Sequence, residues 1–316
     1  MTAQLPFSPH RNYDRARATR SGTGGEEPTL RELFELNPLA GALGAEIRGV
    51  DLGGNIADDL IDRLRQHWLE HRVLFFRGQE LGPSQLAEFG RRFGPLEHYP
   101  FVEPLPDHPE VIPVIKEPDE RANFGGGWHT DLVYRPEPSA ATMLHAIEVP
   151  DRGGDTLFAD GVLAYEALSD RMQALLDGLR VEYHVAHVRR HVHDRSDGES
   201  NYSRSMPARP ASTKGPPAAP SHHPLVRTHP ETGNRSLYFS REHTERFEGM
   251  TIAESRPLLD WLEAHMTQPV FTTRFHWEPG SLAFWDNRCV SHSALNDYAG
   301  ERRYMHRITI AGDTPF

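Results

Sequence analysis

The chain has 316 residues, 37% of them hydrophobic, which is enough to enclose a sizeable core in one large domain or two small ones. Its 34 basic and 45 acidic residues give a net charge of −11, which argues against general nucleic-acid binding. No apolar run approaches the roughly 18 residues of a membrane helix, and the N-terminus lacks a secretory signal pattern. The lone cysteine, Cys289, fits a reducing compartment. We therefore expect a cytoplasmic protein with no membrane or nucleic-acid partner.

The first half of the chain alternates short predicted strands with two helices. Residues 1–30 are polar and rich in Gly and Arg, and we expect them to form a disordered tail. Apolar residues recur at helical spacing over 57–71, and a second helix is predicted over 83–93, with Pro83 in its first turn. Strands are predicted at 45–50, 73–76, 111–115 and 139–149.

The second half is richer in predicted strands. They lie at 155–159, 179–188, 225–228, 237–239, 270–277, 281–285 and 304–311, and helices are predicted at 161–168, 170–178 and 252–266. Residues 189–221 lack apolar periodicity, which is typical of a lid-like insertion. Short strands with peripheral helices predict a mainly β (α+β) fold, a double-sheet jelly roll or double-stranded β-helix, as a single domain over 31–316.

The pair His129 and Asp131, in the sequence Trp-His-Thr-Asp, is the strongest metal-ligand candidate. Residues i and i+2 of a strand point to the same face, so we expect a strand here that brings both side chains to one ion. His-x-Asp also occurs in many surface turns, so a third ligand is needed. His292, which follows the apolar segment 281–285, is the best candidate, with a surface histidine in a turn as the alternative. Two histidines and one carboxylate with open positions are typical of non-haem Fe(II) oxygenases.

Two arginines near the C-terminus are the next functional candidates. On a strand, Arg303 and Arg307 share one face with Met305 and Thr309. Such charges are usually solvated or paired with local acids such as Glu301. If they face a pocket instead, they need an anion, and the planar guanidinium matches a carboxylate.

Several ordered motifs together resemble one known family. They are Trp-His-Thr-Asp at 128–131, Gly-Gly-Asp-Thr at 153–156, Trp-Asp-Asn-Arg at 285–288, His292, Arg303 and Arg307. In this order and spacing the chain resembles, over residues 35–316, the taurine dioxygenase family of Fe(II)/2-oxoglutarate-dependent oxygenases. That family also includes enzymes that act on alkyl sulfates and on aryloxyalkanoate herbicides.

The resemblance implies a role for each candidate. The three metal-ligand candidates would bind Fe(II), which 2-oxoglutarate would chelate through its C1 carboxylate and keto oxygen. The C5 carboxylate of 2-oxoglutarate would pair with Arg303, supported by the Thr156 hydroxyl, and Arg307 would hold the anionic group of the primary substrate. Oxidation by O₂ would release succinate and CO₂. An aspartate at 131 favours hydroxylation over halogenation, because halogenating relatives carry a small residue there.

Departures from the family pattern concern the substrate. The position of the sulfonate-contacting histidine in the taurine enzyme is taken here by Tyr99, or by His98 after a one-residue shift. Gly125 aligns with the asparagine that contacts the taurine amine and has no side chain to offer. These departures argue against taurine itself. With Phe124 and Leu132 as further substrate-binding candidates, they favour a larger, more apolar molecule with one anionic end.

Two other classes of function remain open from the sequence: a metal-dependent hydrolase that uses the same triad, and a non-catalytic small-molecule sensor. A second histidine cluster, at 184, 187, 191 and 193, is expected to be solvated in preference to binding zinc. The resemblance also implies a homo-oligomer, either a dimer or a tetramer.

Overall fold

The computed structural model describes residues 34–184 and 219–316. The predicted tail over 1–30 lies outside the described residues, as does the predicted insertion apart from its last three positions, 219–221. The predicted strand over 179–188 is described only as far as residue 184.

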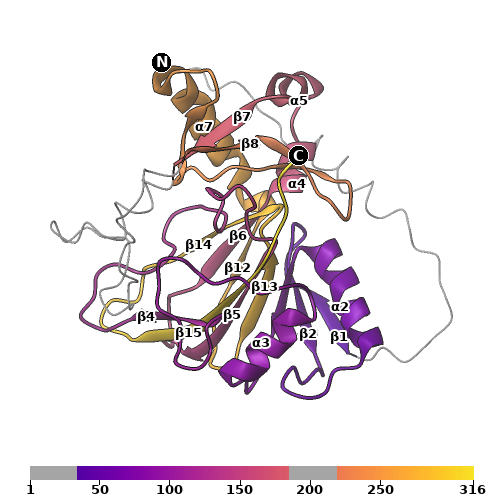
Figure 1. The fold of residues 1–316 in the computed structure, drawn as a ribbon, viewed down its shortest axis with the longest axis vertical. Coiled ribbons are helices and arrows are strands. Elements are labelled where there is room, and N and C mark those ends of the chain that lie inside the picture. Colours follow the sequence, from indigo (N-terminus) through magenta and orange to yellow (C-terminus); the bar gives the residue numbers. More distant parts are fainter. Residues whose placement is uncertain (1–33, 185–218) are drawn as a thin grey trace.

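A seven-stranded sheet forms the centre of the molecule (Figure 1). Its strand order is β1 (Glu35–Pro38), β2 (Ala45–Arg48), β3 (Val73–Phe76), β13 (Leu282–Asp286), β5 (Ala141–Glu148), β15 (Arg303–Ile310) and β4 (Ile112–Lys116). All neighbours pair antiparallel except β2 and β3, which are parallel. Segments far apart in sequence therefore become neighbours, with the C-terminal strand β15 between β5 and β4.

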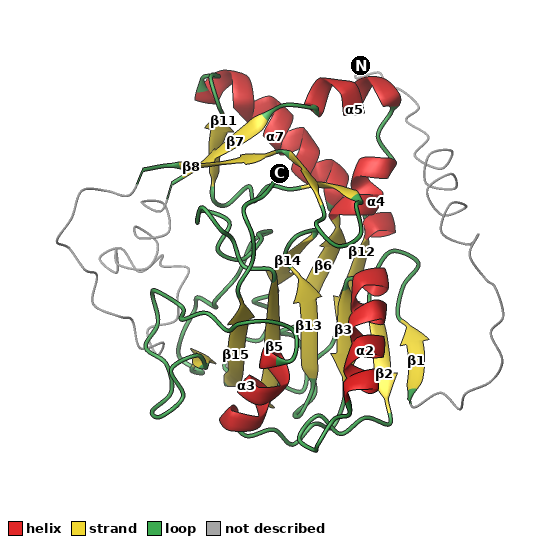
Figure 2. Cartoon of the chain, turned by 45° about the vertical axis from the view of Figure 1, so that its right-hand side comes forward, coloured by secondary structure: helices red, strands yellow, loops and turns green. Residues whose placement is uncertain are grey.

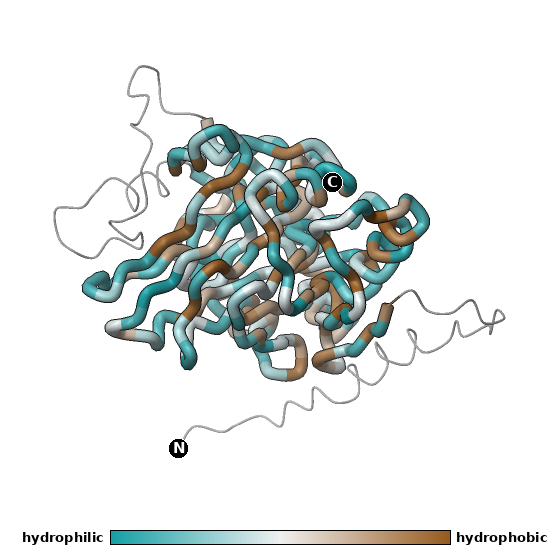
Figure 3. The backbone as a smooth tube through the Cα atoms, turned by 90° about the horizontal axis from the view of Figure 1, so that it is seen from below, coloured by the Kyte–Doolittle hydropathy of each residue, from teal (hydrophilic) through white to brown (hydrophobic). Residues whose placement is uncertain are grey.

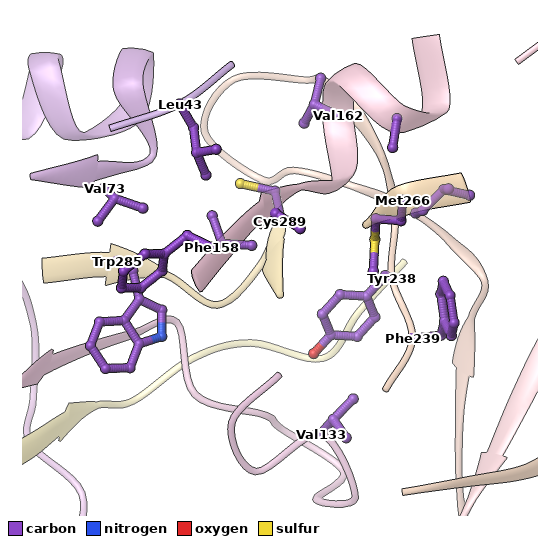
Figure 4. Close-up of a cluster of buried hydrophobic side chains, with 14 of the residues drawn as sticks. Leu43, Val73, Val133, Phe158, Val162, Tyr238, Phe239, Met266, Trp285 and Cys289 are labelled. Atoms are coloured by element: carbon purple, nitrogen blue, oxygen red, sulfur yellow. The ribbon is translucent and has the colours of Figure 1, made fainter. Parts of the chain in front are cut away.

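A second sheet packs against one face of the first. It consists of β12 (Thr272–Phe275), β6 (Thr156–Asp160) and β14 (Val290–Ala294). Phe75 of β3 stacks on Phe275 with ring centroids 4.0 Å apart, and Phe158 of β6 lies 5.6 Å from Trp285 of β13 (Figure 4). Apolar side chains from both sheets thus fill the space between them, and the predicted double-sheet jelly roll is confirmed.

Two helices cover the opposite face of the large sheet (Figure 2). They are α2 (Asp58–His71) and α3 (Pro83–Arg91), as the apolar spacing predicts. Trp68 of α2 stacks on Phe284 of β13 at 4.5 Å, inside a second apolar cluster that includes Met143 and Ile308. Alternate residues of β3 and β13 therefore face different cores, which is why these two strands are nearly continuous apolar runs.

The remaining elements gather at one end of the two sheets (Figure 2). A small sheet of β11 (Thr244–Phe247), β7 (Arg180–Tyr183) and β8 (Ser221–Pro224) lies there with α7 (Ile252–Met266). The Thr251 hydroxyl and the Glu254 side chain form a capping box that begins α7. The other elements are α4 (Gly161–Glu166), α5 (Asp170–Leu176), the hairpin of β9 (Val226–Thr228) and β10 (Arg235–Leu237), and the 3₁₀ helix η1 (Pro269–Phe271).

The helices over described residues are all found where the sequence predicts them, but several strands differ. The strand expected over 128–131 is wrong: His129 makes one isolated bridge, and a turn begins at Asp131. The segment 270–277 begins as η1 and becomes a strand only at Thr272. Strands β1, β8, β11 and β14 were not predicted, because each is short and mixes polar with apolar residues.

Hydropathy varies at short range along the backbone (Figure 3). Within the described residues, no helix has both the length and the apolar character needed to cross a membrane.

Candidate active site

The three predicted metal ligands meet between the two sheets. His129 and His292 form a backbone bridge, with the His129 N–H donating to the His292 carbonyl at 3.0 Å and the reverse bond at 2.8 Å. The bridge places the two imidazole rings 4.2 Å apart. His292 lies in the middle of β14, while Asp131 opens the turn that follows the bridge. Pairing to β14, in place of a local strand, therefore brings His129 to the site.

The geometry of the triad suits one divalent ion. Asp131 Oδ1 lies 3.8 Å from Nε2 of His129 and 3.8 Å from Nε2 of His292. One ligand atom from each residue can be chosen so that all three lie within 4.8 Å of one another, and all three residues are buried. Two imidazole nitrogens and one carboxylate oxygen on one side of an ion leave its other positions open.

Both histidines are set up to offer a lone pair. His129 Nδ1 lies 3.0 Å from the Gly127 carbonyl, which can only accept, so Nδ1 carries the proton and Nε2 is free for a metal. Burial, followed by the neighbouring His129, holds the pKa of His292 well below its usual range. The neutral imidazole required of a metal ligand is therefore the form present at neutral pH.

Asp131 is ionised despite its burial. Burial alone would raise its pKa, but Arg307 and then the two histidines hold the pKa of the carboxyl below its usual range. Arg307 Nη2 lies 2.8 Å from Asp131 Oδ1. The site therefore contains an ionised carboxylate, which is the form of the side chain that binds a metal ion.

Gly125 allows the loop before the triad to approach His129. Its φ of +78° lies in the left-handed region, and a Cβ there would lie 3.3 Å from His129 Cε1. A side chain would meet both backbone strain and the edge of the imidazole. The Ala294 N–H donates to the Gly125 carbonyl at 2.9 Å, which ties this loop to the end of β14.

Arg303 lines the same cavity, and some of its hydrogen-bond donors are unpaired within the described part of the chain. It is 4% exposed, and among the described residues its Nε and Nη2 have no hydrogen-bond partner. Burial lowers its pKa, although Tyr298 and Asp155 act in the opposite direction. A buried cation without a partner is costly, so this arrangement fits an anionic ligand that completes it.

Trp277 supports the two residues predicted to hold 2-oxoglutarate, and the sequence did not reveal it. Its indole Nε1 donates to Thr156 Oγ1 at 3.0 Å, and its ring lies 5.8 Å from the Arg303 guanidinium carbon. Because an indole only donates, Thr156 must accept this bond and keeps its own proton for a ligand. The sequence signal was weak, since Trp277 looks like any core aromatic at a strand end.

The predicted substrate residues divide into two groups. Arg307 lies over the rings of Tyr99 and Phe124, at 5.0 and 5.6 Å, and Phe124 and Gly125 line the cavity. The other three do not line it: Tyr99 is buried behind Phe124 with the ring centroids 6.2 Å apart, His98 is exposed with Nδ1 2.8 Å from the Pro109 carbonyl, and Leu132 is buried in the core.

The second histidine cluster forms an ion-pair network as far as it is described. His184 Nε2 lies 2.9 Å from Glu182 and 3.3 Å from Glu245, while Arg246 contacts both oxygens of Glu182. Although burial opposes it, hydrogen bonds led by that of His184 lower the pKa of Glu182 to about 2. The predicted cluster members at 187, 191 and 193 lie outside the described residues.

Comparison with known proteins identifies relatives over most of the chain. A family model described as taurine catabolism dioxygenase TauD, TfdA family matches residues 35–309. The chain is 30% identical over 283 residues to an alpha-ketoglutarate-dependent sulfate ester dioxygenase of Pseudomonas putida, covering 89% of this chain and 91% of the relative. It is 33% identical over 294 residues to an alpha-ketoglutarate-dependent 2,4-dichlorophenoxyacetate dioxygenase of Cupriavidus pinatubonensis, covering 88% and 97%.

Solved structures agree with the sequence matches. A taurine dioxygenase from Burkholderia xenovorans superimposes with a TM-score of 0.74 at 35% identity, covering 89% of this chain and 90% of that chain. The match therefore extends through both sheets and the loops that carry the buried triad.

Proposed function

Because this chain belongs to the taurine catabolism dioxygenase TauD, TfdA family, we propose that its His129, Asp131 and His292 are the ligands of Fe(II). The protein is an Fe(II)- and 2-oxoglutarate-dependent dioxygenase that oxidises a small organic substrate carrying an anionic group, with release of succinate and CO₂. The comparisons give no support to the hydrolase and sensor alternatives.

The donor set supports this assignment. Two imidazoles, that of His292 held neutral by its lowered pKa, and an ionised carboxylate lie within reach of one ion in a buried cavity. Bound iron and 2-oxoglutarate supply the activation of O₂ and the oxidising power for a C–H bond of the substrate. The protein itself would hold the three donors close together, exclude bulk water and orient both substrates.

Arg303 and Thr156 are the proposed holders of the distal carboxylate of 2-oxoglutarate. The observation that carries this proposal is the pair of partnerless guanidinium nitrogens of Arg303 in the cavity that also contains the triad. Thr156, whose oxygen already accepts from Trp277, has its proton available for the same carboxylate. A planar guanidinium beside a hydroxyl donor suits a carboxylate better than a point charge would.

Arg307 is the proposed holder of the anionic group of the primary substrate. Its guanidinium is buried against Tyr99 and Phe124, which offer an aromatic surface to the remainder of the molecule. We propose a substrate larger and more apolar than taurine, since Gly125 offers no side chain to an amine. Sulfates, sulfonates and carboxylates all remain within this class.

The proposal is tested by succinate formation. Protein loaded anaerobically with Fe(II) would receive 2-oxoglutarate, O₂ and a panel of sulfate esters, sulfonates, aryloxyalkanoates and other carboxylates. We expect a substrate-dependent rise in succinate that is absent in His129→Ala and retained in His184→Ala, which removes a histidine of the ion-pair network. No succinate with any compound, together with no 2-oxoglutarate binding, would reject the assignment.

Several broader features are also proposed. We infer one domain over 31–316, a cytoplasmic location, a homo-oligomer and no nucleic-acid or membrane partner. Two cores that share one central sheet support a single domain, and a net charge of −11 supports the lack of nucleic-acid binding. The oligomer rests on family resemblance, and light scattering of the purified chain would test it.

A further inference from the structure

The two carboxylate oxygens of Asp131 have different surroundings. Oδ1 faces both imidazole Nε2 atoms at 3.8 Å and lies 2.8 Å from Nη2 of Arg307. Oδ2 accepts a hydrogen bond from the Thr142 hydroxyl at 2.7 Å. Asp131 and Thr142 are both buried, so bulk water does not compete for either carboxylate oxygen.

Thr142 belongs to a chain of three hydrogen bonds that runs from Trp285 to Asp131. Its oxygen accepts from Asn287 Nδ2 at 2.9 Å, and Asn287 Oδ1 accepts from the indole Nε1 of Trp285 at 2.9 Å. All three residues are at most 2% exposed, so competing water is excluded from the chain.

The direction of every bond in this chain is fixed by chemistry. An indole N–H can only donate, so the Asn287 carbonyl must face Trp285 and its amide nitrogen must face Thr142. The Thr142 oxygen is then an acceptor toward Asn287, and its one proton is committed to Asp131. A carboxylate can only accept, so the chain begins at a pure donor and ends at a pure acceptor with no alternative orientation.

These hydrogen bonds are anchored in the central sheet. Thr142 of β5 and Trp285 of β13 are directly paired in the central sheet, and the Asn287 N–H donates to the Ala140 carbonyl at 2.9 Å. The Trp285 ring, visible beside Phe158 in Figure 4, also lies 4.7 Å from the His292 ring. One tryptophan therefore packs on one metal ligand and orients another through two intermediates.

We propose that Trp285, Asn287 and Thr142 are positioning residues that make Asp131 a one-oxygen ligand. The inference rests on the proposed iron site. With Oδ2 held by Thr142, Oδ1, which also contacts Arg307, would be the oxygen that binds the ion, and Asp131 would offer it a single donor atom. Hydrogen bonds to metal ligands of this kind typically change metal affinity by about 10–100-fold.

The test compares three substitutions at Thr142 by titration with Mn²⁺ alone. Thr142→Val keeps the shape and removes the hydroxyl, and we expect its Kd to rise about 10–100-fold. Thr142→Ser keeps the hydroxyl and should stay within about threefold of the unaltered chain, a difference small beside that loss. Thr142→Ala also lacks the hydroxyl and replaces the valine variant if that variant folds poorly.

Co²⁺ absorption spectra give a readout that a merely structural role would not move. The d–d bands should change in Thr142→Val and not in Thr142→Ser, because only the former frees Oδ2. Thr309→Val is the control, since Thr309 is a buried threonine of β15 directly paired with Thr142. It should leave both the Mn²⁺ affinity and the Co²⁺ spectrum unchanged.

The outcomes separate this inference from the function on which it rests. Failure of the unaltered chain to bind Mn²⁺, or full binding by His129→Ala, would overturn the iron site itself and the inference with it. If binding depends on His129 but Thr142→Val keeps the affinity and spectrum of the unaltered chain, only the positioning role is overturned. Equal losses in Thr142→Val and Thr142→Ser would also overturn it, since the hydroxyl would not be the cause.

Discussion

Arg303, the proposed partner of the distal carboxylate of 2-oxoglutarate, lowers the stability of the fold when no anion is bound beside it. Its guanidinium is buried, and two of its nitrogens have no partner among the described residues. We expect Arg303→Met to raise the KM for 2-oxoglutarate roughly 30-fold or more, since a charged partner in a buried pair is lost. We also expect a higher Tm without 2-oxoglutarate, because a desolvated, unpaired charge is removed. Succinate kinetics and thermal unfolding measure the two effects.

The neighbouring arginine provides the matched control. Arg302 contacts Glu117 and Glu148 at the surface and does not line the cavity. Arg302→Met should leave the KM for 2-oxoglutarate within about twofold, because exposed ion pairs contribute little. Equal losses in both variants would contradict the assigned role of Arg303.

Trp277 makes a second prediction at the residue scale. In Trp277→Phe the Thr156 hydroxyl loses the donor that orients its proton, while most of the ring under Arg303 remains. We expect the KM for 2-oxoglutarate to rise about fivefold to tenfold, the cost of roughly one hydrogen bond, with less change in the KM for the primary substrate. A rise in the KM of the primary substrate alone would show that Trp277 acts elsewhere.

At the scale of elements, the sequence predicts strands that have clear apolar faces. For β15, the sequence predicts Arg303 and Arg307 on one face, and both line the cavity. His129 and Asp131 were expected on a strand over 128–131, which the structure lacks. His129 is positioned by a single bridge to a distant strand, and no local pattern encodes such pairing. Strand β14 was missed because its sequence, VSHSA, contains polar residues that serve the site as well as apolar residues that face the core, so it lacks a clear apolar pattern.

The loop that leads to the triad gives a prediction of its own. Gly125→Ala adds a Cβ at φ +78°, 3.3 Å from His129 Cε1, so we expect weaker Mn²⁺ binding. Gly249→Ala is the control, because Gly249 has φ +77° and a Cβ there would meet nothing within 4 Å. Both variants should lose about 1–2 kcal/mol of stability from the left-handed backbone, and only Gly125→Ala should lose metal affinity. Normal Mn²⁺ binding by Gly125→Ala would show that this loop does not constrain the imidazole.

At the scale of the whole molecule, composition and strand periodicity predict the fold class. They do not predict which residues, far apart in the sequence, come into contact. Thr156, Trp277, His292 and Arg303 come from different segments, and the order of strands in two sheets brings them together. Motif resemblance supplied this contact information for Arg303. It could not supply Trp277 or Thr142, whose roles depend on which donor faces which acceptor.

Burial of histidines makes the stability of the whole molecule depend on pH. Burial lowers the pKa of His145 and His265, and it lowers the pKa of His223 and His306 from 6.5 to about 4. The folded chain keeps these rings neutral, whereas the unfolded chain protonates them below about pH 6.5. For His223 and His306, the stability that depends on the neutral ring is therefore complete above pH 6.5 and is lost as the pH falls from 6.5 to about 4.

The size of this effect can be tested one ring at a time. At pH 5, a histidine with a pKa of about 4 in the folded state contributes about 2 kcal/mol less to stability than at pH 7.5. His306→Gln removes one such group, so the difference in unfolding free energy between pH 7.5 and pH 5 should shrink by about this amount in urea titrations. If His306→Gln keeps the pH dependence of the unaltered chain, the pKa of His306 does not differ between the folded and unfolded states, and the prediction is wrong.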